Sequence, residues 1–153
     1  MASVAYNSFK TLLFTAGLTA GMGAGGIAGV KIGLLKQLTT TPDNPDHDFM
    51  NDIATDEFND TNYTAGFGGA GRKTLANRAI STDNVNNRSE WDFDDIVWTT
   101  LGGTQTAVMA PTMREITNDA ATNLLTIHDI ADTATNGTDF TLQVGSEGAV
   151  HIT

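Results

Sequence analysis

Three aspartates, Asp92, Asp94 and Asp95, form the most enzyme-like cluster in the sequence. Side chains two positions apart on an extended strand point to the same face, so Asp92 and Asp94 would lie side by side. Paired carboxylates of this kind bind calcium or act on glycosidic bonds. The spacing is also typical of a solvated strand face opposite Trp91 and Phe93. We favour the solvated face and keep the three aspartates as candidates for a cation or sugar site.

The remaining chemistry-bearing residues form no recognisable motif. Asp43, Asp46 and Asp48 make an oxygen-rich loop, but the glycine and terminal glutamate of an EF-hand loop are missing. There is no nucleophile elbow, Walker loop or HExxH motif. No metal-ligand spacing relates the histidines, which are His47, His128 and His151. We therefore expect no enzymatic activity and no cofactor.

The composition narrows the class of protein further. The 153-residue chain fits one domain. It has no cysteine, which excludes disulfides and thiolate metal sites. Its net charge of −10 argues against direct binding to the nucleic-acid backbone, which needs a basic surface. Only 17% of the residues are charged, whereas 24 threonines, 12 asparagines and 16 glycines make up about a third of the chain. Threonine favours strands, and asparagine and glycine favour turns, so many short strands are expected.

The charge is divided unequally along the chain. Residues 1–42 contain Lys10, Lys31 and Lys36 and no acidic residue, which gives +3. Residues 43–153 hold five basic and 18 acidic residues, which gives −13. The three lysines are therefore candidates for contacts with an acidic surface on a partner or a neighbouring copy. A second possibility is that this segment folds back on the acidic body of its own chain.

The segment 12–30 is uncharged and needs to be tested as a membrane span. A glycine stands at every fourth position from 17 to 33, as on the contact face of some membrane helices. However, six of the residues in 12–30 are glycines, so few large apolar side chains remain to favour insertion. We therefore expect no membrane contact and no cleaved signal peptide, and interpret the segment as a glycine-rich arm.

The elements that position these residues are mostly short strands. Residues 5–15 have apolar side chains on one helical face, with Ser3 as a cap, and predict a short helix. A helical turn is expected within 48–55, and Asn136-Gly137 is the sharpest hairpin signal. The expected strands are 30–35, 75–81, 89–93, 96–98, 105–110, 124–130, 140–144 and 149–152.

The spacing of these strands predicts a mainly β fold, an antiparallel β-sandwich or jelly-roll-like domain with a short N-terminal helix and a Gly-rich arm. Residues 39–153 form the β-rich body. Residues 1–38 hold the helix, the arm and the first strand, as part of the same domain or as an assembly arm. The core is expected to contain the large side chains Trp91, Phe93, Trp98, Phe140 and Leu142.

Nine segments, in order along most of the chain, resemble a family of small virion proteins of tailed bacteriophages. They are 4–10 (Val-Ala-Tyr-Asn-Ser-Phe-Lys), 30–32 (Val-Lys-Ile), 41–43 (Thr-Pro-Asp), 47–49 (His-Asp-Phe), 62–66 (Asn-Tyr-Thr-Ala-Gly), 73–77 (Lys-Thr-Leu-Ala-Asn), 83–84 (Asp-Asn), 92–98 (Asp-Phe-Asp-Asp-Ile-Val-Trp) and 136–144 (Asn-Gly-Thr-Asp-Phe-Thr-Leu-Gln-Val). The resemblance implies a β-rich structural protein, a capsid cement or decoration protein, and gives no catalytic residues.

This resemblance sets the expected function and partners. The protein would bind the major capsid protein on the outer surface of the virion, after assembly in the host cytoplasm. It would contact neighbouring copies of itself there, as a homo-oligomer within the shell. One alternative is a tail, neck or fibre component. Another, from a different class, is a sugar- or calcium-binding β module that uses Asp92, Asp94 and Asp95.

Overall fold

The computed structural model of the protein describes residues 3–7, 10–11, 28–36, 40–146 and 148–152. Within these ranges the fold is mainly β, and every pair of neighbouring strands is antiparallel, which confirms this part of the prediction. In chain order the strands and short 3-10 turns are β1 (Ser3–Ala5), β2 (Val30–Ile32), η2 (Met50–Asp52), η3 (Ala54–Asp56), β3 (Lys73–Thr74), β4 (Ala79–Asp83), β5 (Arg88–Asp92), β6 (Ile96–Trp98), β7 (Thr106–Arg114), η4 (Asp119–Ala121), β8 (Asn123–Ala134), β9 (Phe140–Leu142) and β10 (Val150–Ile152).

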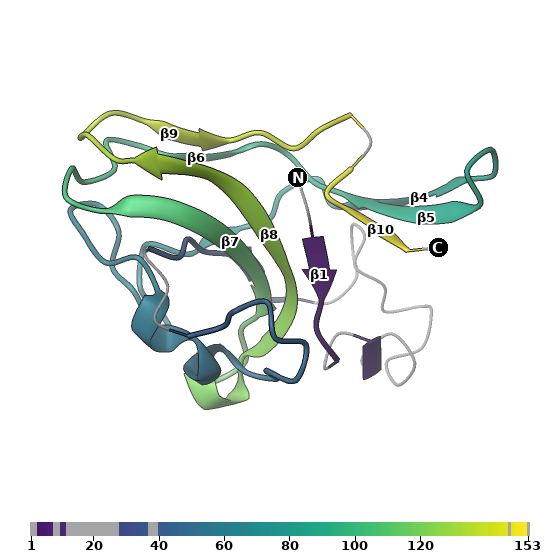
Figure 1. Ribbon diagram of the computed structural model, residues 1–153, viewed down its shortest axis with the longest axis horizontal. Coiled ribbons are helices and arrows are strands. Elements are labelled where there is room, and N and C mark those ends of the chain that lie inside the picture. The colour runs from purple at the N-terminus through teal and green to yellow at the C-terminus, as the bar shows by residue number, and fades with distance from the viewer. Residues whose placement is uncertain (1–2, 8–9, 12–27, 37–39, 147, 153) are drawn as a thin grey trace.

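A five-stranded sheet with the strand order β1-β8-β7-β2-β3 forms the centre of the molecule. Its longest strands, β7 and β8, form a hairpin that curves across the view in Figure 1. The pairing shifts register between Ala107 and Met109 and again between Thr112 and Met113. Such bulges bend a strand and change which face its side chains meet. Ala107 and Ala110, three positions apart, therefore contact one apolar cluster, whereas Met109 and Met113 contact another.

Apolar clusters lie on both faces of the central sheet. Leu124 and Leu125, neighbours in β8, belong to different clusters, as expected for side chains on opposite faces. The smaller cluster includes Met50 from η2 and Ile53, so the 3-10 turns cover one face. The larger cluster joins the central sheet to the other strands and contains Val30, Ile32, Leu34, Phe58, Tyr63, Leu75, Trp91, Phe93, Ile96, Trp98, Leu101, Ala107, Ala110, Leu125, Leu142 and Val150.

Two small sheets complete the fold. One has the strand order β10-β5-β4, and the other pairs β6 with β9. The β4–β5 hairpin extends away from the rest of the molecule on the right of Figure 1. All residues of β4 are exposed except Asp83, which is half-buried. The core predicted from the sequence is largely present, since Trp91, Phe93, Trp98 and Leu142 are buried and Phe140 packs against them.

The N-terminal helix predicted for residues 5–15 is wrong at its start, and no such helix is seen among the described residues of this segment, which are 5–7 and 10–11. Ser3–Ala5 form strand β1, which pairs with residues 126–128 of β8. Tyr6 is fully buried, and its N–H donates to the Leu125 carbonyl. One helical-type bond follows, from Lys10 N–H to the Tyr6 carbonyl (3.1 Å), and residues 8–9 and 12–15 lie outside the described residues. Pairing with β8 satisfies the backbone groups that the helix would have satisfied.

The described parts of residues 1–38 are built into the central sheet. β1 occupies one edge, and β2 lies between β3 and β7. The predicted strand 30–35 is confirmed over Val30–Ile32, and it continues to Leu35, whose N–H donates to Met109. These residues therefore belong to the same domain as the body. The glycine-rich stretch predicted as an arm lies mostly in residues 12–27, outside the described residues.

One predicted turn and one predicted strand need correction. Asn136-Gly137 does not connect a hydrogen-bonded hairpin, because β8 pairs with β7 and β1 whereas β9 pairs with β6. The Asn136 Oδ1 instead accepts hydrogen bonds from Thr138, and Gly137 N–H donates to Leu101, which ties this turn to another loop. The predicted strand 75–81 is interrupted at Asn77, which has a φ of 48°. Asparagine adopts this left-handed conformation more readily than most residues, so the chain changes direction between β3 and β4.

Candidate interaction surfaces

The aspartates Asp92, Asp94 and Asp95 each accept a hydrogen bond from a different partner. Asp92 Oδ1 accepts from Phe93 N–H (2.9 Å), Asp94 Oδ2 accepts from the Asn77 side chain (2.8 Å), and Asp95 Oδ1 accepts from Val144 N–H (2.8 Å). β5 ends at Asp92, so the predicted strand geometry, with Asp92 and Asp94 on one face, does not extend to Asp94. The three carboxylates therefore bind three separate partners, two of them in other parts of the chain, and hold the connection between β5 and β6.

The other candidate ligands are distributed over separate elements. Asp46 accepts a hydrogen bond from the Asn7 side chain (3.1 Å), and the Asp48 N–H donates to Asp52. His47 lies in the loop before η2, whereas His128 and His151 lie in β8 and β10. Within the residues that the structure describes, no group of three His, Asp or Glu side chains is placed to hold a metal ion.

His128 is part of a buried row of polar side chains in the central sheet. Its Nε2 lies 2.9 Å from the Thr126 hydroxyl, which lies 2.6 Å from the Thr112 hydroxyl on β7. All three residues are buried. Burial lowers the pKa of His128 to about 4, so the imidazole is neutral at pH 7. The row joins β7 to β8 by side-chain hydrogen bonds in addition to the backbone pairing.

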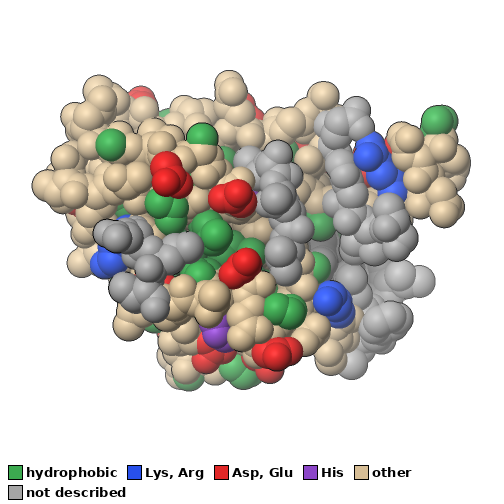
Figure 2. Space-filling view, viewed as in Figure 1, with side chains coloured by type: hydrophobic (Ala, Val, Ile, Leu, Met, Phe, Trp, Pro, Cys, Tyr) green, Lys and Arg blue, Asp and Glu red, His purple; other side chains and the backbone are tan. Residues whose placement is uncertain are grey.

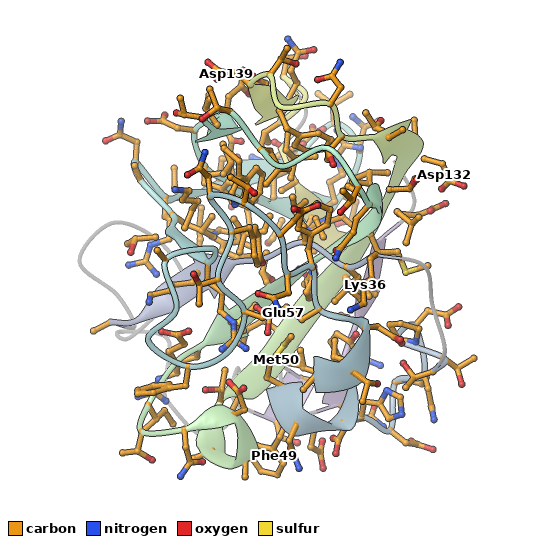
Figure 3. All side chains as sticks on the ribbon, turned by 90° about the vertical axis from the view of Figure 1, so that its left-hand side faces the viewer. Lys36, Phe49, Met50, Glu57, Asp132 and Asp139 are labelled. Atoms are coloured by element: carbon orange, nitrogen blue, oxygen red, sulfur yellow. The ribbon has the colours of Figure 1, made fainter. Side chains whose placement is uncertain are left out.

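The three candidate lysines have different surroundings. Lys10 is exposed and contacts the side chain of Asn7 (3.4 Å). Lys31, on β2, forms an ion pair with Glu115 of the same chain (2.5 Å), so its charge is compensated within the molecule. Lys36 is half-buried, and its backbone N–H donates to Asp56 (2.9 Å); its position is labelled in Figure 3. For Lys31 the structure therefore favours folding back on the acidic body over contact with a partner.

A buried ion-pair network around Arg72 was not predicted from the sequence. The Arg72 guanidinium binds Glu57 through two hydrogen bonds of 2.7 Å each, from Nε and Nη2. Its Nη1 donates to Glu115 (3.0 Å) and Asp119 (2.7 Å). Because Glu115 also binds Lys31, the network connects β2 with the segments after η3, before β3 and around η4. No sequence signal identified it, since its members lie up to 88 positions apart (119 − 31).

The network shifts the pKa values of Arg72 and Tyr63. Burial alone would lower the pKa of Arg72, but the hydrogen bonds to Glu57 and Asp119 raise it well above its ordinary value. The Tyr63 hydroxyl donates a hydrogen bond to Glu57 Oε1 (3.5 Å). Burial and the negative charge of Glu57 raise the pKa of the Tyr63 hydroxyl. Glu57 lies inside the molecule in Figure 3, whereas Asp132 and Asp139 lie at its periphery. The network therefore holds β2 and the segments around η3, β3 and η4 together.

The exposed surface carries acidic and apolar side chains and an open groove. Acidic side chains are spread over the face shown in Figure 2, with apolar side chains between them. An open groove of about 460 Å³ lies between β8 and β9, with Asp129 and Asp139 in its lining. Large apolar side chains are exposed on the β4–β5 hairpin, where Ile80 is 53% and Val85, at the tip, 93% exposed.

No helix in the described part of the chain is long and apolar enough to cross a bilayer. Comparison with protein-family models, curated proteins and solved structures found no match.

Proposed function

We propose that the protein is a virion structural protein, a capsid cement protein that binds the major capsid protein and stabilises the head. The observation that carries the proposal is the β4–β5 hairpin, which extends from a tightly held body with Val85 almost fully exposed at its tip. An apolar side chain presented in this way is suited to contact with another protein. The ordered sequence resemblance to small phage virion proteins supports the same function.

The acidic side chains that could carry chemistry are engaged in contacts within the chain, and this also supports a structural role. The acidic groups Asp92, Asp94 and Asp95 each accept a hydrogen bond from another residue of the chain, and Glu57, Glu115 and Asp119 neutralise Arg72. These side chains hold loops in fixed positions, as a protein in a rigid shell requires. Partners would be the major capsid protein and neighbouring copies of this chain on the outside of the particle. Repetition over the shell would strengthen each moderate contact through effective concentration.

The finer fold that we propose is a sandwich-like arrangement. Side chains of the central sheet, such as Ile32 and Ala110, share one apolar cluster with Trp91 of the β10-β5-β4 sheet and with Trp98 and Leu142 of the β6-β9 sheet. A shared cluster between sheets is typical of face-to-face packing. A high-resolution structure in which the two small sheets do not face the central sheet would contradict this arrangement.

Copy number in purified virions tests the function. A cement protein is expected in hundreds of copies per particle, whereas six or twelve copies would indicate a neck or tail ring. Quantitative mass spectrometry against the major capsid protein measures this ratio. Particles that lack the protein should lose heat resistance and regain it when the purified protein is added back.

Substitutions on the β4–β5 hairpin test whether its tip binds the capsid. Val85→Asp places a charge on the exposed tip, and it should reduce occupancy on capsids that lack the protein. Val97→Asp is the matched control, because Val97 is also exposed (46%) but lies on β6. Equal occupancy for wild type and Val85→Asp would remove the hairpin tip from the interface. Glycan binding by the purified protein that is lost on Asp94→Ala would favour the sugar-binding module instead.

A further inference from the structure

The free edge of β4 has the properties of a strand-pairing site. β4 is the outer strand of the β10-β5-β4 sheet, and no other strand in the described part of the chain pairs with it beyond β5. Unpaired edge strands present a row of N–H and C=O groups to other chains. Two or three short strands that extend from a domain are only marginally stable alone, so added strands would stabilise them.

The register of the sheet shows which backbone groups point outward from β4. The Trp91 carbonyl accepts a hydrogen bond from Ala149 N–H (2.8 Å), so the Trp91 backbone faces β10 and not β4. Its partner on β4 is Ile80, and this pair therefore does not exchange backbone hydrogen bonds. Because bonding alternates along a strand, the N–H and C=O groups of Ile80 and Thr82 point away from β5. Both residues thus offer a donor and an acceptor at the free edge.

The side chains of this sheet form an apolar row that ends at the same edge. Val150, Trp91 and Ile80 are directly opposite one another on β10, β5 and β4. Val150 and Trp91 are 6% and 5% exposed, whereas Ile80 is 53% exposed. The apolar face of the sheet therefore continues from the core to the edge, where nothing in the described part of the chain covers it.

The edge also lacks the features that prevent association. Natural edge strands are commonly protected by lysine, proline or a bulge. Residues 79–82 (Ala-Ile-Ser-Thr) contain neither charge nor proline, and the β4–β5 register is continuous over all five residue pairs. Asp83, at the end of the strand, is already paired with Arg88 of the same hairpin (3.2 Å), so the edge itself presents no charge that would repel an identical strand.

From these features we infer that two copies of the chain pair through β4, antiparallel and about a two-fold axis, to form a continuous six-stranded sheet. An isologous contact of this kind uses the same edge of both copies and closes after two subunits. The two Ile80 side chains then lie on the same face of the joined sheet and cover one another. The inference deepens the proposed function, since it names the surface by which neighbouring copies contact each other.

The oligomeric state of the purified chain tests the pairing without any capsid, so it can fail or succeed separately from the proposed function. Sedimentation equilibrium over a concentration series should show the mass rising from 16.1 kDa toward twice that value. Ile80→Lys, which adds an edge charge, should raise the dimer dissociation constant by about tenfold or more. Val97→Lys is the matched control at a similarly exposed position on β6 and should leave the constant unchanged. Thr82→Lys serves as the second edge variant if Ile80→Lys does not fold.

Cross-linking supplies an independent measurement, because the natural chain has no cysteine. Ile80→Cys should form a disulfide-linked dimer rapidly under mild oxidation, and Val97→Cys should not. A wild-type chain that remains monomeric at every concentration would overturn the inference. A dimer that Ile80→Lys and Thr82→Lys leave intact, or equal cross-linking at positions 80 and 97, would also overturn it.

Discussion

Arg72 and Glu57 form a two-point ion pair in which both side chains are almost completely inaccessible to solvent, at 0% and 1% exposure. The two residues lie on either side of a long connection between η3 and β3. Their pairing holds that connection against the central sheet, and Gly66 N–H donates a further hydrogen bond to the Glu57 carboxylate (3.0 Å).

Removal of the Glu57 charge should destabilise the protein strongly. Glu57→Gln leaves Arg72 with only Glu115 and Asp119 as charged partners, and breaking a buried pair costs about 3 kcal/mol or more. Urea unfolding at pH 7 measures the change. Glu90→Gln is the control, since its pair with Arg88 is partly exposed on the hairpin and should contribute less than about 1 kcal/mol. Equal losses in the two variants would contradict a special role for the buried pair.

Gly71→Ala should disrupt the aromatic part of the core. An added Cβ at position 71 would lie 2.2 Å from the ring of Tyr63, which is 1% exposed and stacks against Trp98. Overpacking at a rigid site costs about 3 kcal/mol. Gly145→Ala is the matched control, because no atom lies within 4 Å of the added carbon, and it should change the free energy of unfolding by less than about 0.5 kcal/mol. Thermal unfolding of both variants provides the comparison.

Stability should fall as the pH is lowered from 6.5 to 4. Burial lowers the pKa of His128 to about 4 from 6.5, so between these values the unfolded chain binds a proton that the folded chain does not. Protonation therefore favours unfolding in this window, by roughly 3 kcal/mol at its acidic end. Urea unfolding at pH 7 and pH 4.5 measures the loss. His128→Gln should reduce it, and an unchanged loss would assign the pH dependence to other groups.

The charge of Lys10 should contribute to capsid binding, whereas the charge of Lys31 should contribute to stability. Lys10→Glu should leave the free energy of unfolding unchanged but weaken capsid binding at low salt, because Lys10 is exposed and distant charge attraction is screened by salt. Lys31→Met should lower stability, since it removes the partner of Glu115. Urea unfolding and capsid binding at two salt concentrations separate the effects. Capsid binding by Lys10→Glu equal to that of wild type would remove Lys10 from the interface.

The sequence predicted strands well where their signal was local. β6 has the predicted bounds of 96–98, and β8 contains the whole predicted strand 124–130. Residues 5–15 were predicted as a helix because Tyr6 and its apolar neighbours fit a helical period. Pairing with residues 121 to 125 positions away (126 − 5 and 128 − 3) decided that β1 is a strand, and no local pattern reports such a partner.

The candidate site was less predictable for the same reason. Asp92, Asp94 and Asp95 were candidates for one shared site because they are close in sequence, yet each has a separate partner. Arg72 stands in an ordinary glycine-rich turn, and nothing near it in the sequence indicates three charged partners in the folded chain. Charge clusters made by folding are visible only when the topology is known.

The pairing of β1 with β8 sets the order of events during synthesis on the ribosome. Tyr6 is fully buried in the folded chain, but its backbone partner, Leu125, is translated 119 residues later (125 − 6). At about 5–20 residues per second, the first strand remains without that partner for roughly 6–24 s. Newly made chains therefore leave Tyr6 uncovered until β8 has been translated, and crowded synthesis would favour their premature association.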